Sequence, residues 1–279
     1  MLLSSCLEED VTPSIADAVS ETEGMLVPVE IIISGSDYCG VERIDSIDNT
    51  HIKVSFDGSN CIDVYKRYGS IDMYLVNGKD WKDKDAVISV VYSNFLSERN
   101  NKREDRKLPS AILINGTELI TNLSGGDMDE FDNGTIDFLQ RRYVGKNLTV
   151  EYNNSGYPRS INTIIMREFI NTGDEIQMIT NGDGKVDNYE NVVEWGLDSE
   201  GKEFWNVIEE PIVKKLCNRR WLMVDGIKTK YFRKKAARSK IYGVDENGNE
   251  VNDCNSFGFK EEWTNEKGIK KSEIWGYYE

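Results

Sequence analysis

The residues best suited to binding chemistry lie between Lys214 and Lys240. This stretch holds eleven Lys and Arg residues and one acid, Asp225, in a chain whose formal charge is −15. Aromatic residues alternate with the cations, so rings can pack on sugars or apolar groups while cations bind an acidic glycan or lipid headgroups. The alternative is a strand pair whose charges are solvated or paired with acids elsewhere. The candidate ligand-binding residues are Arg219, Arg220, Trp221, Tyr231, Arg233, Lys234 and Lys235.

A second polar group resembles the calcium-binding loop of EF-hand proteins. Its oxygen-bearing residues are Asn181, Asp183, Asp187 and Glu190, with Gly184 where that loop turns sharply. Ile179 stands where the loop needs its first oxygen ligand, which favours a plain Asn-Gly-Asp-Gly turn with solvated carboxylates. We therefore expect no cofactor, with weak calcium binding as the alternative.

The sequence gives little support for catalysis. His51 is the only histidine, and it precedes Ile52 and Val54 in an expected strand, which favours a place on a sheet face. No nucleophile elbow, phosphate-binding loop or dinucleotide-binding glycine motif is present. We therefore expect a protein without catalytic activity. A carbohydrate-processing enzyme that uses paired carboxylates is the alternative, because that chemistry needs only two of the 49 acids.

The extreme N-terminus carries a further chemical group. The run Leu3-Ser4-Ser5-Cys6 resembles a bacterial lipobox, and the acids Glu8-Glu9-Asp10 resemble the acidic run behind the lipidated cysteine of Bacteroidetes-type surface lipoproteins. The resemblance implies a lipid on Cys6 and a location on the outer membrane surface or in the periplasm. Its implied partner is the membrane, through the lipid. An acidic glycan, for which the basic stretch is the candidate site, or another surface protein is a further expected partner.

Cysteine usage and charge agree with export. Five cysteines less Cys6 leave four, which can form the disulfides Cys39–Cys61 and Cys217–Cys254 in an oxidising compartment; free, packed thiols are the alternative. The negative formal charge disfavours nucleic acid, whose phosphates need clustered cations. No apolar run reaches the roughly 18 residues of a membrane-spanning helix.

Strand signals dominate the chain from Val27 onward. Short β-branched runs such as Val27–Ile33 and His51–Phe56 end at turn residues, and Asn77-Gly78 and Asn115-Gly116 are further turn signals. The sequence therefore predicts an all-β fold. Two segments are ambiguous: 161–170 as a short helix or linker, and the stretch after Gly184 as strand or helix.

The expected organisation has three parts. Residues 1–24 are an acidic tether behind the lipobox-like start, since they are too polar to form a core. Residues 25–155 are an antiparallel β-sandwich, of which an immunoglobulin-like form is one version, although the immunoglobulin Cys…Trp…Cys spacing is absent. Residues 156–279 are a meander of β-hairpins. Its recurring glycines resemble YD-type hairpin repeats of bacterial surface proteins; they are Gly156, Gly184, Gly201, Gly226, Gly248 and Gly268.

These expectations combine into one functional hypothesis. The chain is predicted to be an exported, lipid-anchored protein with a binding or structural role. Enzymatic glycan processing and weak calcium binding are the alternatives.

Overall fold

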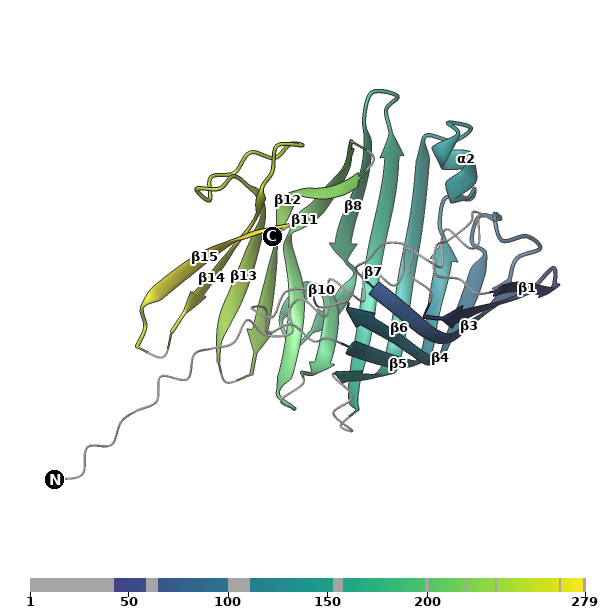
Figure 1. Ribbon diagram of the computed structural model, residues 1–279, viewed down its shortest axis with the longest axis horizontal. Helices are drawn as coiled ribbons and strands as arrows, with labels where there is room; N and C mark the ends of the chain where they lie inside the picture. The colour runs from purple at the N-terminus through teal and green to yellow at the C-terminus, as the bar shows by residue number, and fades with distance from the viewer. Residues whose placement is uncertain are drawn as a thin grey trace.

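A computed structural model describes residues 43–58, 65–99, 111–152, 158–198, 201–218, 220–233, 235–265 and 267–277. The chain builds one antiparallel sheet of 15 strands (Figure 1). The strands before the expected domain boundary are β1 (Arg43–Asp48), β2 (His51–Asp57), β3 (Tyr65–Asn77), β4 (Val87–Arg99), β5 (Ala111–Asn122) and β6 (Phe138–Tyr152). The helix α2 (Met128–Asp132) lies between β5 and β6.

The later strands continue the same sheet. They are β7 (Arg159–Asn171), β8 (Ile176–Gly182), β9 (Gly184–Val186), β10 (Tyr189–Leu197), β11 (Glu203–Cys217), β12 (Arg220–Phe232), β13 (Lys235–Val244), β14 (Gly258–Thr264) and β15 (Lys270–Gly276). Strands that follow one another in the chain are neighbours in the sheet, except at one junction. There β10 pairs with β7 and β11, and β8 also pairs with β7 and β11. The all-β prediction is confirmed.

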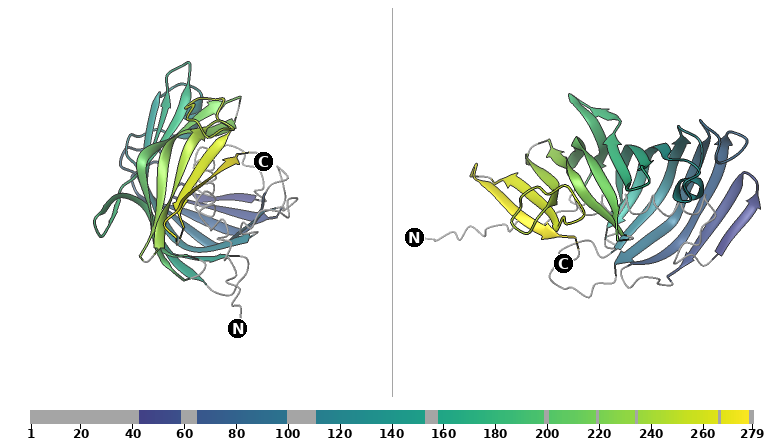
Figure 2. Two further views of the ribbon diagram at one scale, coloured as in Figure 1. Left: turned by 90° about the vertical axis from the view of Figure 1, so that its left-hand side faces the viewer. Right: turned by 90° about the horizontal axis from the view of Figure 1, so that it is seen from above.

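The division into a sandwich and a meander is not confirmed. Strands β6 and β7 flank the expected boundary, and they pair from Phe138 with Ile170 to Val150 with Arg159. The sheet therefore runs across this boundary without a break. It is curved and twisted along its length, as the end view in Figure 2 shows.

Alternation of burial along the strands defines an inner face of the sheet. In β7, every second residue from Ile161 to Phe169 is buried. The expected helix or linker at 161–170 is thus wrong, because a two-residue period suits a strand that buries one face. Tyr189, Val192 and Val193 likewise lie in strand β10.

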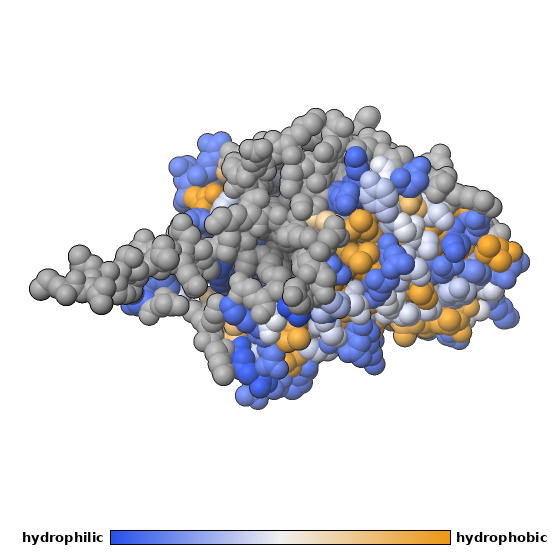
Figure 3. Space-filling model, turned by 60° about the horizontal axis from the view of Figure 1, so that its bottom comes forward, coloured by the Kyte–Doolittle hydropathy of each residue, from blue (hydrophilic) through white to orange (hydrophobic). Residues whose placement is uncertain are grey.

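The main core lies on this inner face. It joins residues from both halves of the chain, among them Ile71, Ile120, Tyr143, Ile165 and Ile208. A smaller cluster around Phe131 packs helix α2 against Leu139 and Phe169 at one end of the same face. On the side of the molecule shown in Figure 3, the coloured residues form a mixture of hydrophobic and hydrophilic groups. Within the described residues, no helix is long and apolar enough to cross a membrane.

Two expected turn glycines lie inside strands. Gly116 lies within β5 with a φ of +129°, where the β5–β6 register shifts between Asn115 and Glu118. Gly226 lies within β12 with a φ of +113°, and a Cβ there would approach the Pro211 carbonyl oxygen to 2.5 Å. An Asn-Gly or Asp-Gly pair serves a bulge as well as a hairpin, since both need positive φ. Among the glycines of the predicted repeat, Gly226 thus lies inside a strand, and Gly156 lies outside the described residues.

One predicted cysteine pair is bridged. Cys217 at the end of β11 forms a disulfide with Cys254, whose Cα lies 5.6 Å away. Cys6, Cys39 and Cys61 lie outside the described residues. Cys217 also packs against Leu222 and Val224, so the disulfide joins a small apolar cluster to the segment between β13 and β14.

Removing this disulfide should lower stability. The bridge closes a sequence separation of 37 residues, and in the chain-entropy model a loop of this size stabilises by roughly 3–4 kcal/mol. The variant with both Cys217→Ala and Cys254→Ala should show that loss in urea unfolding. A reductant should destabilise the unmodified chain more than the variant; equal effects on both would contradict the bridge.

Candidate functional site

Three aromatic rings from neighbouring strands meet on the outer face of the sheet. Tyr189 of β10, Trp205 of β11 and Tyr231 of β12 lie with ring centroids 4.4 Å (Tyr189–Tyr231), 5.3 Å (Tyr189–Trp205) and 6.2 Å (Trp205–Tyr231) apart. Trp205 and Tyr231 are stacked with an interplanar angle of 12°. We refer to these three residues as the aromatic cluster.

Strand register produces this cluster. Trp205 pairs directly with Tyr231 in β12, so these two rings project from one face at adjacent positions, and Tyr189 joins them from the start of β10. Val192 and Val207 pack beneath the rings. Tyr189 and Tyr231 are only half-buried, whereas Trp205 is 8% exposed.

Polar groups border the aromatic cluster. The Tyr231 hydroxyl donates a 2.8 Å hydrogen bond to Glu209, and the pKa of Tyr231 is raised to about 12 by burial and by this carboxylate. Arg233 pairs with Glu203 at 2.7 Å, and Lys185 pairs with Glu190. The arrangement offers apolar ring faces beside hydrogen-bonding carboxylates.

The structure does not gather the predicted ligand-binding residues into one site. Tyr231 belongs to the aromatic cluster, and Arg233 lies beside it. Trp221 is ten residues before Tyr231 on β12, a span of roughly 33 Å along a strand, and is 39% exposed. Arg219 and Lys234 lie outside the described residues, and only the backbone of Arg220 and Lys235 is described.

Much of the basic stretch points into the molecule. Three lysines are buried on the inner face: Lys228, Lys230 and Lys240. In the register of β12 and β13, Lys228 lies opposite Lys240 and Lys230 lies opposite Arg238. Buried acids lie on the same face; they are Glu194, Asp198 and Glu261. Arg238 approaches Glu261 at 3.9 Å. Strand alternation thus turns these three lysines inward, which the density of charge in the sequence does not reveal.

Lys230 has the most perturbed environment of these cations. It is 3% exposed, its Nζ lies 4.3 Å and 5.3 Å from the ring centroids of Phe204 and Phe232, and it has no hydrogen-bond partner among the described residues. Burial lowers its pKa from 10.5 to about 8, against the opposing attraction of Glu194 and Asp198.

The loop that resembles an EF-hand is built from β8, β9 and β10. Asn181 pairs with Met166 in the sheet, and Asp183 binds Arg142 at 2.6 Å. Asp187 occupies the turn between β9 and β10 with a φ of +52°. Within the described ranges, no group of three or more His, Cys, Asp or Glu is placed to hold a metal ion.

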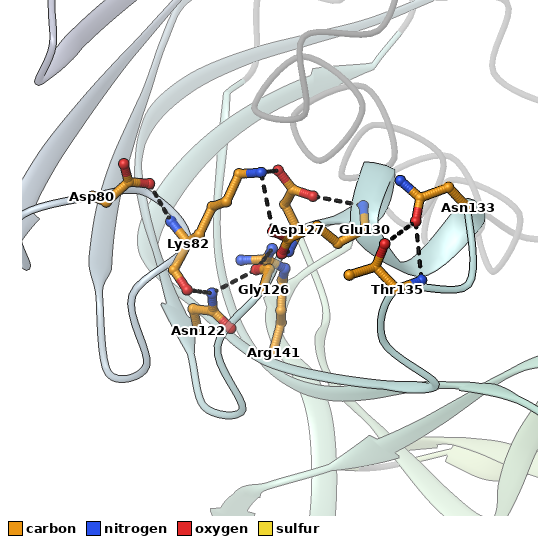
Figure 4. A network of polar contacts seen from close by, with 9 residues as sticks. All are labelled: Asp80, Lys82, Asn122, Gly126, Asp127, Glu130, Asn133, Thr135 and Arg141. Atoms are coloured by element: carbon orange, nitrogen blue, oxygen red, sulfur yellow. Dashed lines mark hydrogen bonds and ion pairs between the residues drawn. The ribbon is translucent and has the colours of Figure 1, made fainter.

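A polar network fixes α2 to the end of the sheet (Figure 4). Asp127 and Glu130 form a capping box, and Lys82 binds Asp127 at 2.8 Å and Glu130 at 3.4 Å. Asn122 and Arg141 donate to the Gly126 carbonyl oxygen at 2.9 and 3.2 Å. The Asp-x-x-Glu spacing at 127–130 is a sequence signal for this helix start that the strand analysis missed.

The only histidine and a carboxyl group with a raised pKa belong to different parts of the molecule. His51 bonds to Asp72 at 3.0 Å and stacks on Tyr74 at 4.2 Å, both in the adjacent strand β3. Asp132 in α2 is a carboxyl group with a raised pKa, caused by burial and by Asp129. It belongs to the α2 end of the sheet and not to the aromatic cluster.

Comparison with known proteins adds no relative. No protein-family model matches the chain, and searches of curated proteins and of solved structures find no similar protein.

The buried Lys230 predicts a specific pH dependence. Its folded pKa of about 8 lies below the unfolded value of 10.5, so between these values the unfolded chain binds more protons and stability rises with pH. The difference between the two pKa values corresponds to about 3 kcal/mol of unfolding free energy, which the protein gains once Lys230 is deprotonated in both states. Below pH 8 both states are protonated and the slope vanishes.

Urea unfolding between pH 7.5 and 10 measures this slope. Lys230→Met should flatten it, whereas Lys185→Met, which removes a largely exposed lysine, should leave it unchanged. The same rise in both variants would contradict the assignment to Lys230.

Proposed function

We propose that the chain is an exported, lipid-anchored binding protein without catalytic activity, and that it binds saccharide at the aromatic cluster. The observation that carries the proposal is the aromatic cluster beside the Glu209 carboxylate, in which the half-buried rings of Tyr189 and Tyr231 pack against the buried Trp205. The C–H face of a sugar ring is apolar and packs on aromatic rings, while its hydroxyls donate to nearby carboxylates. Binding sites commonly combine such an aromatic lining with a few placed polar groups.

Charge around the aromatic cluster favours a neutral saccharide. The bordering groups are three acids, Glu190, Glu203 and Glu209, and two cations, Lys185 and Arg233. Much of the positive charge of the 214–240 stretch faces inward instead. An acidic glycan would therefore meet net negative charge here.

The location rests on the N-terminal sequence. A lipid on Cys6 and the acidic residues behind it would tether the folded sheet at a membrane surface, where a saccharide ligand is abundant. A multiply acylated cysteine anchors stably, unlike a single chain.

Acylation of Cys6 is directly testable. When the chain is expressed behind a bacterial export signal, it should partition into detergent, and mass spectrometry should find acyl chains on Cys6. Cys6→Ala should move the protein to the aqueous phase. An unmodified Cys6 in the exported protein would refute the anchor and leave the saccharide proposal standing.

Saccharide binding is tested by titration calorimetry on the full chain. Cellohexaose serves as the neutral probe and hexagalacturonate as the acidic one. Cellohexaose should bind, and Tyr189→Ala should weaken binding about tenfold, because one stacking ring is lost. Trp221→Ala removes an exposed aromatic at the far end of β12 and should leave the affinity unchanged.

Each outcome decides between interpretations. Thermal unfolding of both variants shows whether the fold is retained. Binding of hexagalacturonate alone would overturn the preference for a neutral ligand. Loss of cellohexaose binding in Trp221→Ala but not in Tyr189→Ala would move the site away from the aromatic cluster.

A further inference from the structure

Arg167 is a buried cation on the inner face of the sheet. It lies in β7 directly opposite Arg141 in β6 and Thr180 in β8, and it is 1% exposed. Ile165 and Phe169, two residues before and after it on the same face, are also buried. Register therefore forces this side chain into the interior.

The guanidinium group has unused donors. Among the described residues, Nε, Nη1 and Nη2 of Arg167 have no hydrogen-bond partner. Its Cζ lies 5.2 Å from the ring centroid of Tyr143, which faces the same interior and is fully buried. The Tyr143 hydroxyl also lacks a partner in this part of the chain. Two buried side chains in contact thus present unsatisfied donors.

Other charged side chains lie on the neighbouring strands β5 and β6 and at helix α2. Arg141 belongs to the network of Figure 4, which sets Lys82 and Arg141 beside the carboxylates of Asp127 and Glu130. The network drawn there holds two cations and three acids, because Asp80 also accepts a hydrogen bond from the backbone of Lys82. On the side of β5, Glu118 accepts a 3.2 Å hydrogen bond from Tyr92. None of these carboxylates accepts a hydrogen bond from Arg167, whose three guanidinium nitrogens stay without a partner in the described part of the inner face.

An arginine cannot relieve such burial by losing its proton. Lys230, on the same sheet, lowers its pKa to about 8, but a guanidinium stays charged in proteins. A buried charge without a partner costs several kcal/mol. A bound anion removes that cost directly.

We propose that Arg167 and Tyr143 bind a small monovalent anion inside the sheet. The guanidinium supplies a planar set of N–H donors and Tyr143 an O–H donor, both suited to chloride or to a short carboxylate such as formate. A guanidinium carries one positive charge, which matches a monovalent anion. The close apolar neighbours Ile165 and Phe169 call for a small ion.

Thermal unfolding of the full chain in defined salts tests this site. The ionic strength is held constant with sodium gluconate, whose anion is too large for the interior, while sodium chloride or sodium formate replaces it. Occupancy at ten times the dissociation constant should raise the unfolding midpoint by about 3 °C. An increase of the unfolding midpoint in chloride, in formate or in both shows which of these anions the site binds.

Two variants separate the site from a general salt effect. Arg167→Met should abolish the anion-dependent rise and unfold at a higher temperature than the unmodified chain in gluconate, because the buried charge is gone. Arg142→Met removes the neighbouring arginine of β6, which lies at the surface and pairs with Asp183; this variant should keep the rise. If Arg167→Met does not fold, Tyr143→Phe, which removes only a hydroxyl, should reduce the rise.

The proposal is overturned by either of two results. One is an identical midpoint in gluconate, chloride and formate for the unmodified chain. The other is an anion-dependent rise that persists in Arg167→Met. A bromide soak of crystals of the full chain offers a direct check, with an anomalous peak expected at the Arg167 guanidinium.

Discussion

Antiparallel hydrogen bonding between strands that follow one another is the interaction on which this molecule depends. Almost all of its backbone pairing joins sequential neighbours into one sheet, and the sheet has a single inner face. Neighbouring residues in a strand point to opposite faces, so the register of each pair decides which side chains enter the interior. Both candidate sites follow from register: the aromatic cluster on the outer face and Arg167 on the inner one.

The inner face is unusual in combining a core with many charges. Buried side chains such as Ile165 and Tyr143 alternate along the strands with Arg167 and Arg141, and farther along the sheet Lys230 lies against Phe204. Charges of this kind are costly unless they are paired, deprotonated or bound to a ligand. Three answers are found here: Arg238 lies close to Glu261, Lys230 shifts its pKa, and Arg167 is the cation for which we propose a bound anion.

Local sequence patterns predicted much of the fold but little of the site. The β-branched run that starts at His51 became strand β2, and the all-β class followed from many such runs. Gly116 and Gly226 were misplaced because positive φ serves bulges as well as turns. The basic stretch around Tyr231 marks this residue as a binding candidate, but nothing in the sequence indicates that Tyr189 and Trp205 lie beside it. Trp205 meets Tyr231 because β11 pairs with β12 in this register, and a register shift between Val192 and Glu194 separates Tyr189 from the part of β10 that pairs with Trp205; neither leaves a local signal.

The succession of neighbouring strands also bears on how the chain folds. In hairpins such as β3–β4 or β14–β15 the paired strands follow one another in the chain, so most strand pairs form between consecutive elements. Rates of folding rise as contacts become more local, which favours growth of the sheet by successive addition of strands. The exception is the junction where β10 and β11 return to β7 and β8. This junction requires the longest loop closures of the sheet, and we infer that it is the slow step that unites two quickly formed meanders.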